Sequence, residues 1–409
     1  MKHCSGRFVC TIMSKGPIHF LSRIVIILLA LTQPDRMSAA TDPPSYAGWK
    51  NGLSAEASYF PIAVWLQDPK NAERFKNAGI NLYVGLYRGP TSNQLETLRK
   101  AGMGVICGQG RGLAFKEDPI IVGWMHGDEP DNAQSLGQGK GYGPPITPGK
   151  IVADYERLRA ADPTRPILLN LGQGVAWDNY IGRGVRRNHP EDYPEYLKGC
   201  DIGSFDIYPV VHDNAAVAGR LEFVAYGVER LREWTGGEKP VWNCIECTHI
   251  SNANRQATPE QVRAEVWMSL IHGSRGLIYF VHQFKPVFRE AALLDDAEML
   301  GAVTAINRQI RELAPVLNSP TIANGFSFHA TPASVPVASM LKRYANQTYL
   351  FAAAMRAEPA NCTFKFENLG DEAVVEVLGE SRTVAARRGE FNDAFKPYGV
   401  HLYRVASRQ

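Results

Sequence analysis

The most constraining feature of this chain is an eightfold alternation of strand-like and helix-like segments. Each strand-like segment is a short apolar run, and helical periodicity fills most of the gaps between the runs. Parallel strands that helices cover read as apolar runs of this kind. The alternation therefore predicts a (β/α)8 TIM barrel over residues 41–318. The runs begin at Phe60, Ile80, Gly104, Ile120, Pro166, Ile202, Pro240 and Gly276.

Helix-end signals support the same alternation. The sequence "TPEQ" at 258–261 has Thr at the cap, Pro in the first turn and Gln three residues on, which is a capping-box pattern. Two segments depart from the regular unit. The sequence "RGLAFKED" at 111–118 is too short for a good helix, and the Gly-rich insert 132–148 is long enough to indicate a functional or mobile loop.

The pattern changes after Pro320. Short β-rich runs such as "TYLFAAAMR" and "CTFKFEN" follow one another with turn residues between them. This pattern predicts a small antiparallel β-sandwich, residues 319–409, appended to the barrel.

The N-terminal segment 1–40 has the pattern of an export signal. Basic residues precede the apolar run 24–31, and the small residues 38–40 follow it. The run is far shorter than the roughly 20 residues that a membrane span needs. We expect cleavage after Ala40, a start at Met1 or Met13, and a secreted or periplasmic protein without a stable membrane anchor.

Charge and cysteine content exclude several classes. Removal of residues 1–40 takes away five basic residues and one acidic residue, so the net charge changes from +3 to −1. No basic cluster remains that would indicate a nucleic-acid partner. Cys244 and Cys247 have C-x-x-C spacing, but in a strand these positions point to opposite faces. They are expected to pack separately rather than to form a metal site or a redox pair.

Two carboxylates stand at predicted strand ends. In "IIVGWMHGDEPDN" Glu129 follows the fourth strand, and in "PVWNCIE" Glu246 closes the seventh. The carboxyl ends of barrel strands meet at one mouth, so these groups are expected to face each other. Glycoside hydrolysis needs such a pair, because one group protonates the leaving oxygen while the other attacks or activates water.

The strand position and order of these residues resemble the large clan of retaining glycosidases with TIM barrels. In that clan the acid/base Glu ends strand four and the nucleophile Glu ends strand seven. The resemblance covers roughly residues 59–317 and implies that Glu129 is the acid/base and Glu246 the nucleophile. The order of barrel and β-sandwich is also similar to glycosidases of this kind.

Neighbouring positions differ from the clan or extend the site. Asp128 stands where the clan usually has an Asn that holds the sugar 2-hydroxyl, and an ionised Asp cannot donate that hydrogen bond. A carboxylate beside Glu129 would also raise the pKa of Glu129. The resemblance implies that Tyr208 orients the nucleophile, with a rim aromatic as the alternative. Asp206 is either an inward structural acid or a third carboxylate of the site.

Aromatic and histidine residues near strand ends complete the predicted site. Flat rings stack on sugar faces, so Trp65, Trp177 and Tyr279 are candidate substrate platforms. His126 and His282 are candidates for hydrogen bonds to sugar hydroxyls. His212 and His249 also lie near the rim, but no histidine spacing typical of a metal site is present, and no metal is assigned.

The sequence therefore predicts a glycoside hydrolase that cleaves a poly- or oligosaccharide by a retaining, two-carboxylate mechanism without a cofactor. Two alternatives remain open. One is a non-catalytic carbohydrate-binding barrel, and the other is a metal-dependent hydrolase or lyase that uses the rim histidines.

Overall fold

The structure, a computed structural model, describes residues 45–367, 369 and 372–406. Its first part is a sheet of eight parallel strands in the order β6-β5-β4-β3-β2-β1-β8-β7. An isolated parallel bridge between Gly203 and Val241 joins β6 to β7 and closes the barrel. The predicted (β/α)8 barrel is confirmed. The strands are β1 Ile62–Trp65, β2 Leu82–Val84, β3 Gly104–Gly108, β4 Ile121–Met125, β5 Ile167–Leu171, β6 Ile202–Phe205, β7 Trp242–Glu246 and β8 Gly276–Phe280.

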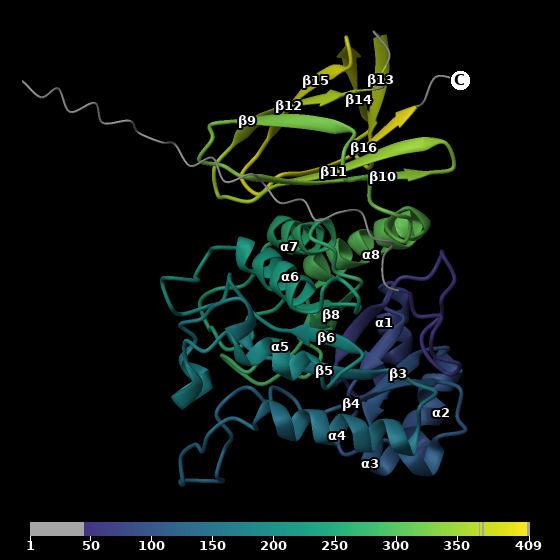
Figure 1. Cartoon of the computed structure of the whole chain (residues 1–409), viewed down its shortest axis with the longest axis vertical. Helices are drawn as coiled ribbons and strands as arrows, with labels where there is room; N and C mark the ends of the chain where they lie inside the picture. Colours follow the sequence, from purple (N-terminus) through teal and green to yellow (C-terminus); the bar gives the residue numbers. More distant parts are fainter. Residues whose placement is uncertain (1–44, 368, 370–371, 407–409) are drawn as a thin grey trace, which may run out of the picture. The chain divides into compact units, whose positions relative to one another are not determined.

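Helices surround the barrel and follow the signals seen in the sequence (Figure 1). Thr258 caps α7 in the predicted capping box with Gln261. The third unit has only one helical turn, α3, followed by a short 3-10 helix, in line with its weak helical pattern. The α-helices are α1 Ala72–Asn77, α2 Ser92–Ala101, α3 Gln109–Gly112, α4 Pro148–Ala161, α5 Asp192–Leu197, α6 Glu222–Trp234, α7 Pro259–Ile271 and α8 Ala297–Leu317. The 3-10 helices are η1 Pro69–Asn71, η2 Leu113–Phe115, η3 Gln173–Val175, η4 Ile181–Arg186 and η5 Ala292–Asp295.

Side chains fill the barrel from both faces of its strands. One core cluster occupies the lumen and includes Ala63, Ile106, Trp242 and Cys244. Another lies between the strands and the helices and includes Cys247. Successive strand residues point to opposite faces, so Cys244 and Cys247 pack on different sides of β7. Both are free thiols, as the sequence predicts.

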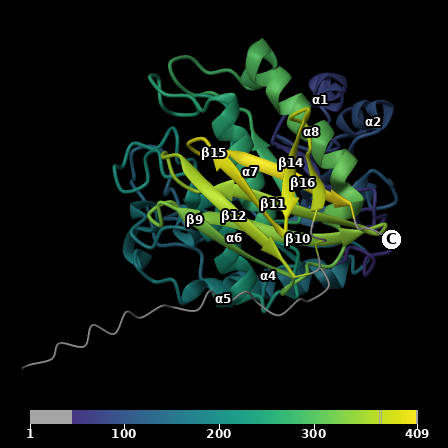
Figure 2. The same cartoon turned by 90° about the horizontal axis from the view of Figure 1, so that it is seen from above.

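The second part is an antiparallel sheet of eight strands in the order β10-β11-β16-β13-β14-β15-β12-β9. The sheet folds over its own core, which contains Leu350 of β11 and Phe364 of β12, so that the strands form two layers (Figures 1 and 2). This agrees with the predicted β-sandwich. The strands are β9 Phe326–Thr331, β10 Val337–Tyr344, β11 Gln347–Ala354, β12 Ala360–Phe366, β13 Glu372–Val377, β14 Arg382–Arg387, β15 Glu390–Phe395 and β16 Val400–Ala406.

The β-sandwich packs on the barrel helices α7 and α8. The rings of Trp267 on α7 and Phe351 on β11 lie 5.3 Å apart, and both side chains are fully buried. Buried Glu222 at the start of α6 pairs with Arg356, with 2.6 Å between Oε1 and Nη1. Lys342 on β10 donates to the carbonyl of Leu317, the last residue of α8, over 3.2 Å. Apolar packing and buried polar bonds therefore join the two parts.

The predicted export signal lies outside the described residues, so cleavage and localisation stay predictions. None of the helices in the described part of the chain is both long and apolar enough to cross a membrane.

Phe351→Ala should lower the free energy of unfolding by about 3–5 kcal/mol, because it removes a fully buried ring from the contact with α7. The measurement is urea unfolding monitored by circular dichroism. Phe328→Ala, on the half-exposed strand β9, is the matched control and should cost clearly less. Equal losses in the two variants would contradict the packing role of Phe351.

Candidate active site

A tight turn places Glu129 at the mouth of the barrel. The chain turns sharply after β4, and Glu129 adopts a left-handed backbone conformation with φ of 42°. Its amide donates to the carbonyl of Asn170 on β5 over 3.1 Å, which fixes the turn. A residue with a side chain rarely takes this conformation, and strain of this kind concentrates at functional sites.

Asp206 follows β6 and forms a side-chain hydrogen bond with Glu129. Its own amide donates to the carbonyl of Leu171 over 3.1 Å. No N–H or hydroxyl group of the described residues satisfies the buried Oδ1 of Asp206. Two carboxyl groups can hydrogen-bond only when one of them carries a proton. The two groups therefore form a pair that shares a proton.

Burial keeps this pair protonated near neutral pH. Desolvation raises the pKa of Glu129 to about 7, and the hydrogen bond from Asp206 partly opposes the rise. Desolvation and the charge of Glu129 raise the pKa of Asp206 well above the usual range of a carboxyl group. Because the two titrations interact, the protons belong to the pair. The pair therefore retains a proton near pH 7.

Asp128 is the exposed carboxylate of the mouth. Its Oδ1 accepts a hydrogen bond of 2.9 Å from Nδ2 of Asn170. The Oδ1 of Asn170 in turn accepts one of 2.8 Å from the hydroxyl of Ser204 on β6. This chain of bonds fixes the amide orientation of Asn170 and, through it, the position of Asp128.

Residues of two loops enclose the pair. Asn132 lies beside both Glu129 and Tyr180, and its side chain acts to lower the pKa of each. Burial and the nearby carboxylates Glu129 and Asp206 raise the pKa of Tyr180. Asp131, by contrast, is fully buried, and it accepts from the amide of Gly172 over 2.9 Å. Asp131 therefore supports the loop, whereas Tyr180 lies beside the proton donor.

Two predicted aromatic residues lie near the mouth. Tyr208 is largely buried, and the carboxylates Asp206 and Glu129 act on its pKa, which burial raises. Trp177 is partly buried and lies 6.3 Å from Tyr180, ring centre to ring centre. It also meets the imidazole of His212 edge to face at 5.5 Å. The structure thus brings both rings to the neighbourhood of Glu129.

Glu246, the predicted partner of Glu129, is held by other groups. Its side chain is fully buried, and its two carboxyl oxygens accept from the amides of Val210, at 2.6 Å, and Val211, at 3.0 Å. It also hydrogen-bonds Glu265, a fully buried residue of α7. Sequence reasoning pairs Glu246 with Glu129, but the carboxyl group that contacts Glu129 is that of Asp206. Glu246 instead ties the loop after β6 to the end of β7.

Other predicted substrate residues are also placed differently from the sequence prediction. Tyr279 is fully buried on the helix side of β8, and its hydroxyl donates to Asn307 over 2.9 Å. His126 lies within 2.8 Å of the carbonyl of Gly199, again away from the mouth. Strand alternation explains both corrections, because neighbouring residues face opposite sides. Trp65 is buried in the lumen core.

The rim histidines do not converge. His282 is near Gln67, His212 near Gln173, and His249 contacts backbone carbonyls of its own loop. Across residues 45–367, 369 and 372–406, no three His, Cys, Asp or Glu side chains gather in a way that could hold a metal ion.

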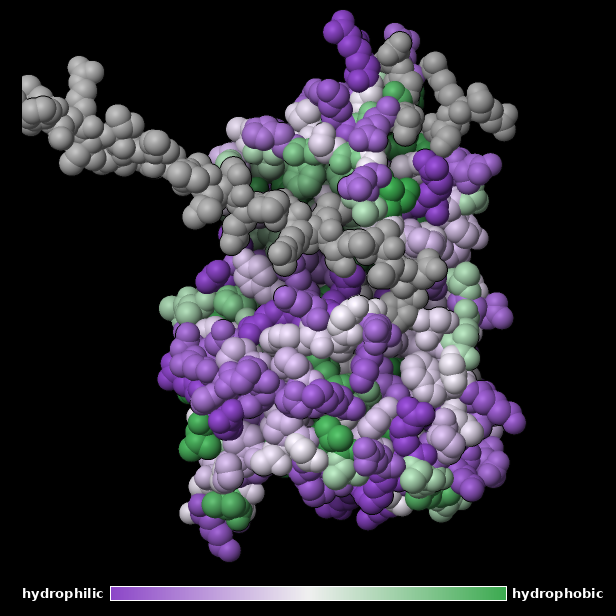
Figure 3. Space-filling view, in the orientation of Figure 1, coloured by the Kyte–Doolittle hydropathy of each residue, from purple (hydrophilic) through white to green (hydrophobic). Residues whose placement is uncertain are grey.

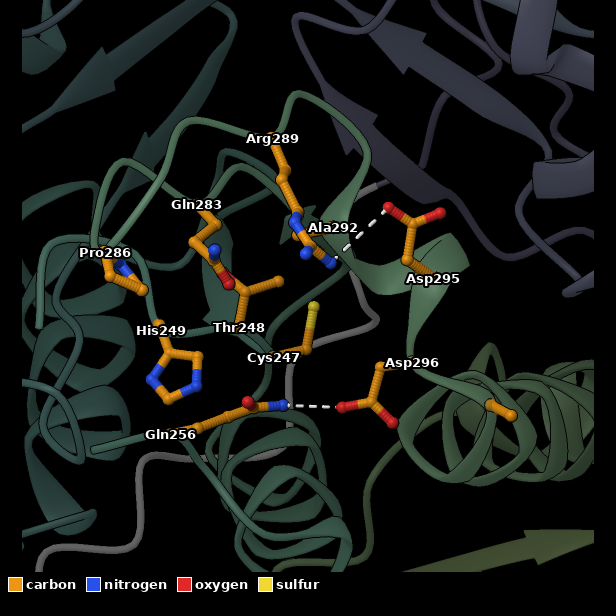
Figure 4. Close-up of a pocket in the computed structure, with 11 residues that line it drawn as sticks. Cys247, Thr248, His249, Gln256, Gln283, Pro286, Arg289, Ala292, Asp295 and Asp296 are labelled. Carbon is orange, nitrogen blue, oxygen red and sulfur yellow. Dashed lines mark hydrogen bonds and ion pairs between the residues drawn. The ribbon is translucent and has the colours of Figure 1, made fainter. Parts of the chain in front are cut away.

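A separate polar cavity of about 500 Å³ opens between the loops after β7 and β8 (Figure 4). Arg289 pairs with Asp295 at 3.9 Å across it, and Gln256 donates to Asp296 over 2.8 Å. Its other lining residues include Cys247, next to Glu246 in the chain. None of the three mouth carboxylates is among its lining residues, so the cavity is distinct from the Glu129–Asp206 pair.

Comparison with known proteins supports the fold. Neither a family model nor a curated protein sequence matches the chain. A putative alpha-galactosidase from Bacteroides fragilis matches with a TM-score of 0.51 at 9% identity, over 88% of this chain and 81% of that one. A GH30 endoxylanase from Clostridium papyrosolvens matches at 0.48 and 12% identity, over 91% and 100% of the two chains. AmyP in complex with maltose matches at 0.48 and 10% identity, over 86% and 98%. The structural neighbours are barrel glycoside hydrolases, and at these identities the likeness concerns the fold.

The buried pair Glu246–Glu265 makes stability depend on pH. Burial raises the pKa of Glu246 to about 7 and that of Glu265 well above its usual range, so the folded state binds protons that the unfolded chain releases. The free energy of unfolding should therefore fall as pH rises from 5 to 8, by about 1.4 kcal/mol per pH unit for each proton that the pair retains and the unfolded chain has lost. Glu265→Gln should flatten the dependence.

Urea unfolding at several pH values measures this effect. The matched control is Glu260→Gln, an exposed position on the same helix, which should keep the slope of the unchanged protein. An unaltered slope in Glu265→Gln would show that the pair does not titrate as described.

Proposed function

We propose that this protein is a glycoside hydrolase in which Glu129 donates the proton to the leaving oxygen. The observation that supports this is the protonated pair of Glu129 and Asp206 at the mouth of the barrel. A glycosidic oxygen must be protonated as its bond breaks, and a carboxyl group with a pKa near 7 can do this at neutral pH.

The mouth also offers surfaces for a carbohydrate. Trp177 and Tyr180 present aromatic rings close to the pair, and Asn132 presents an amide. Sugars combine apolar ring faces with many hydroxyls, so rings and polar groups of this kind suit them. The likeness to barrel glycoside hydrolases, one of them a putative alpha-galactosidase, agrees with a carbohydrate substrate. A non-catalytic carbohydrate-binding barrel is less well supported, because binding alone gives no role to a shared proton.

The second carboxylate of the reaction has two candidates. Retention with Glu246 as nucleophile is the sequence prediction, but both oxygens of Glu246 are occupied by backbone amides in a fully buried site. Asp128 is exposed and is held by Asn170. We therefore assign the attack on the anomeric carbon to Asp128, in a retaining double displacement in which Glu129 later deprotonates the attacking water.

Glu129→Gln should lower kcat at least about 100-fold, because the amide cannot deliver a proton. Release of reducing ends from a panel of xylan, β-glucan, galactan and starch measures the effect. Glu156→Gln, an exposed position on α4, is the matched control and should keep full activity. Unchanged turnover in Glu129→Gln would contradict the assignment of Glu129 as the proton donor.

Azide rescue and product stereochemistry separate the two candidates for attack. In Asp128→Gly, azide should restore turnover and give a glycosyl azide of inverted anomeric configuration, because azide then attacks in a single displacement. With the unchanged protein, proton NMR should show the retained anomer as the first hydrolysis product. If azide rescued Glu246→Gly instead, Glu246 would be identified as the nucleophile. An inverted product would mean that a carboxylate activates water directly.

The role of Asp206 gives a test based on pH. Because Glu129 must be protonated to act, kcat/KM should fall as pH rises through about 7. Asp206→Asn keeps a hydrogen-bond donor beside Glu129, so kcat/KM should still fall as pH rises through about 7. Asp206→Ala removes the hydrogen bond that lowers the pKa of Glu129, so the fall in kcat/KM should move to higher pH. If kcat/KM fell at the same pH in the two variants, the hydrogen bond between Asp206 and Glu129 would be contradicted.

A further inference from the structure

A row of aromatic rings runs from the mouth to the surface along the loop after β8. It begins at Tyr208 beside Asp206 and continues through Phe280 at 5.2 Å and His282 at a further 5.2 Å. Phe284 lies parallel to His282 at 6.0 Å, and Phe288 lies 5.8 Å beyond Phe284. The ring row therefore connects the catalytic carboxyl pair with solvent.

The outer rings stand on a rigid hairpin. Gln283 and Arg289 exchange two backbone hydrogen bonds, of 2.9 and 2.8 Å, and so close the loop 283–289. The amide of Phe284 also donates to the carbonyl of Ile250 in the neighbouring loop over 2.6 Å. Inside the mouth, the side chain of Gln67 lies 3.1 Å from Nε2 of His282. The rings are thus held in place before any ligand binds, which lowers the entropy cost of binding.

These outer side chains are exposed although they are apolar. Phe284 is 48% exposed, Val287 65% and Phe288 60%. Most of the surface drawn in Figure 3 is hydrophilic, with hydrophobic side chains in separate patches. Exposed apolar groups that cluster on one rigid loop mark binding sites. Three side chains are too few for a stable protein interface, which buries roughly 800 Å² on each partner.

We propose that the hairpin 283–289 is a sugar-binding subsite, so that the substrate is a polysaccharide chain extending from the mouth over Phe284 and Phe288. This inference rests on the proposed function. Sugar rings stack on exposed aromatic faces, and the ammonium group of Lys285, exposed between the two rings, can donate to hydroxyls. A single sugar in the mouth would leave the outer rings unused.

The inner part of the row favours a sugar chain over a lipid surface. Phe and Lys side chains on a loop can also anchor a protein at a membrane interface. That role would need only Phe284, Val287 and Phe288. It gives no reason for these outer side chains to stand next to the mouth, whereas the contacts from Phe284 through His282 and Phe280 to Tyr208 place them where a sugar chain would leave the carboxyl pair.

The test is native electrophoresis in gels that contain xylan, β-glucan, galactan or soluble starch. The Glu129→Gln protein is used so that turnover does not degrade the polymer. We expect one polymer to retard this protein, and Phe284→Ala/Phe288→Ala in the same background to bind it roughly tenfold more weakly. Phe284→Tyr/Phe288→Tyr should restore the retardation. Tyr344→Ala, an exposed ring on β10, is the matched control and should not change it.

Three results would overturn the subsite. The first is that none of the four polymers retards the protein, and the second is that the protein is retarded equally with and without the two rings. The third is that the protein binds no polymer but sediments with phosphatidylcholine–phosphatidylglycerol vesicles in a way that depends on the two rings. The test distinguishes failure of the subsite from failure of the hydrolase assignment. Ring-dependent polymer binding with unchanged turnover in Glu129→Gln would keep the subsite and reject Glu129 as the acid.

Discussion

The closure of the barrel at the seam between β6 and β7 is the constraint on which the site depends. Here the backbone ladder is short, with a single bridge between Gly203 and Val241 and a hydrogen bond of 3.2 Å from Gly203 to the carbonyl of Pro240. Glu246 reinforces the seam, because its carboxyl oxygens take two further amides from the loop after β6. The ladder between β5 and β6 places Asp206 beside the turn after β4, and the seam completes the ring of strands around the mouth.

The burial that raises the pKa of Glu129 and Asp206 also has a cost in folding free energy. Desolvation disfavours a charged carboxylate, so Glu129 and Asp206 keep a proton that a solvated carboxyl group would lose far below neutral pH. Asp128 differs from them because it is exposed and held by Asn170. Desolvation nevertheless raises the pKa of Asp128 as well, and the hydrogen bond from Asn170 partly opposes this rise.

The sequence predicts the barrel well, because eight apolar runs with helical segments between them leave few other folds. It also places Glu129 at the mouth, because the end of the apolar run before it can be read from the sequence. The direction of a side chain at such an end is not visible. For Tyr279 and His126 a shift of one position along the strand decides between the mouth and the helix side. The carboxyl group of Glu246 is bound by partners on a loop and a helix, namely Val210, Val211 and Glu265. Tyr180 reaches the neighbourhood of Glu129 from a loop, and a loop has no periodic signal in the sequence.

Helix α7 carries two contacts that face different parts of the molecule. Glu265 holds Glu246, while Trp267, two residues later, packs against Phe351 of the β-sandwich. A displacement of α7 by the β-sandwich would shift Glu265, then Glu246, and then the loop amides that follow Asp206. The appended domain is therefore a brace for α7, and a barrel separated from it would hold Glu265, and with it the end of β7, less firmly.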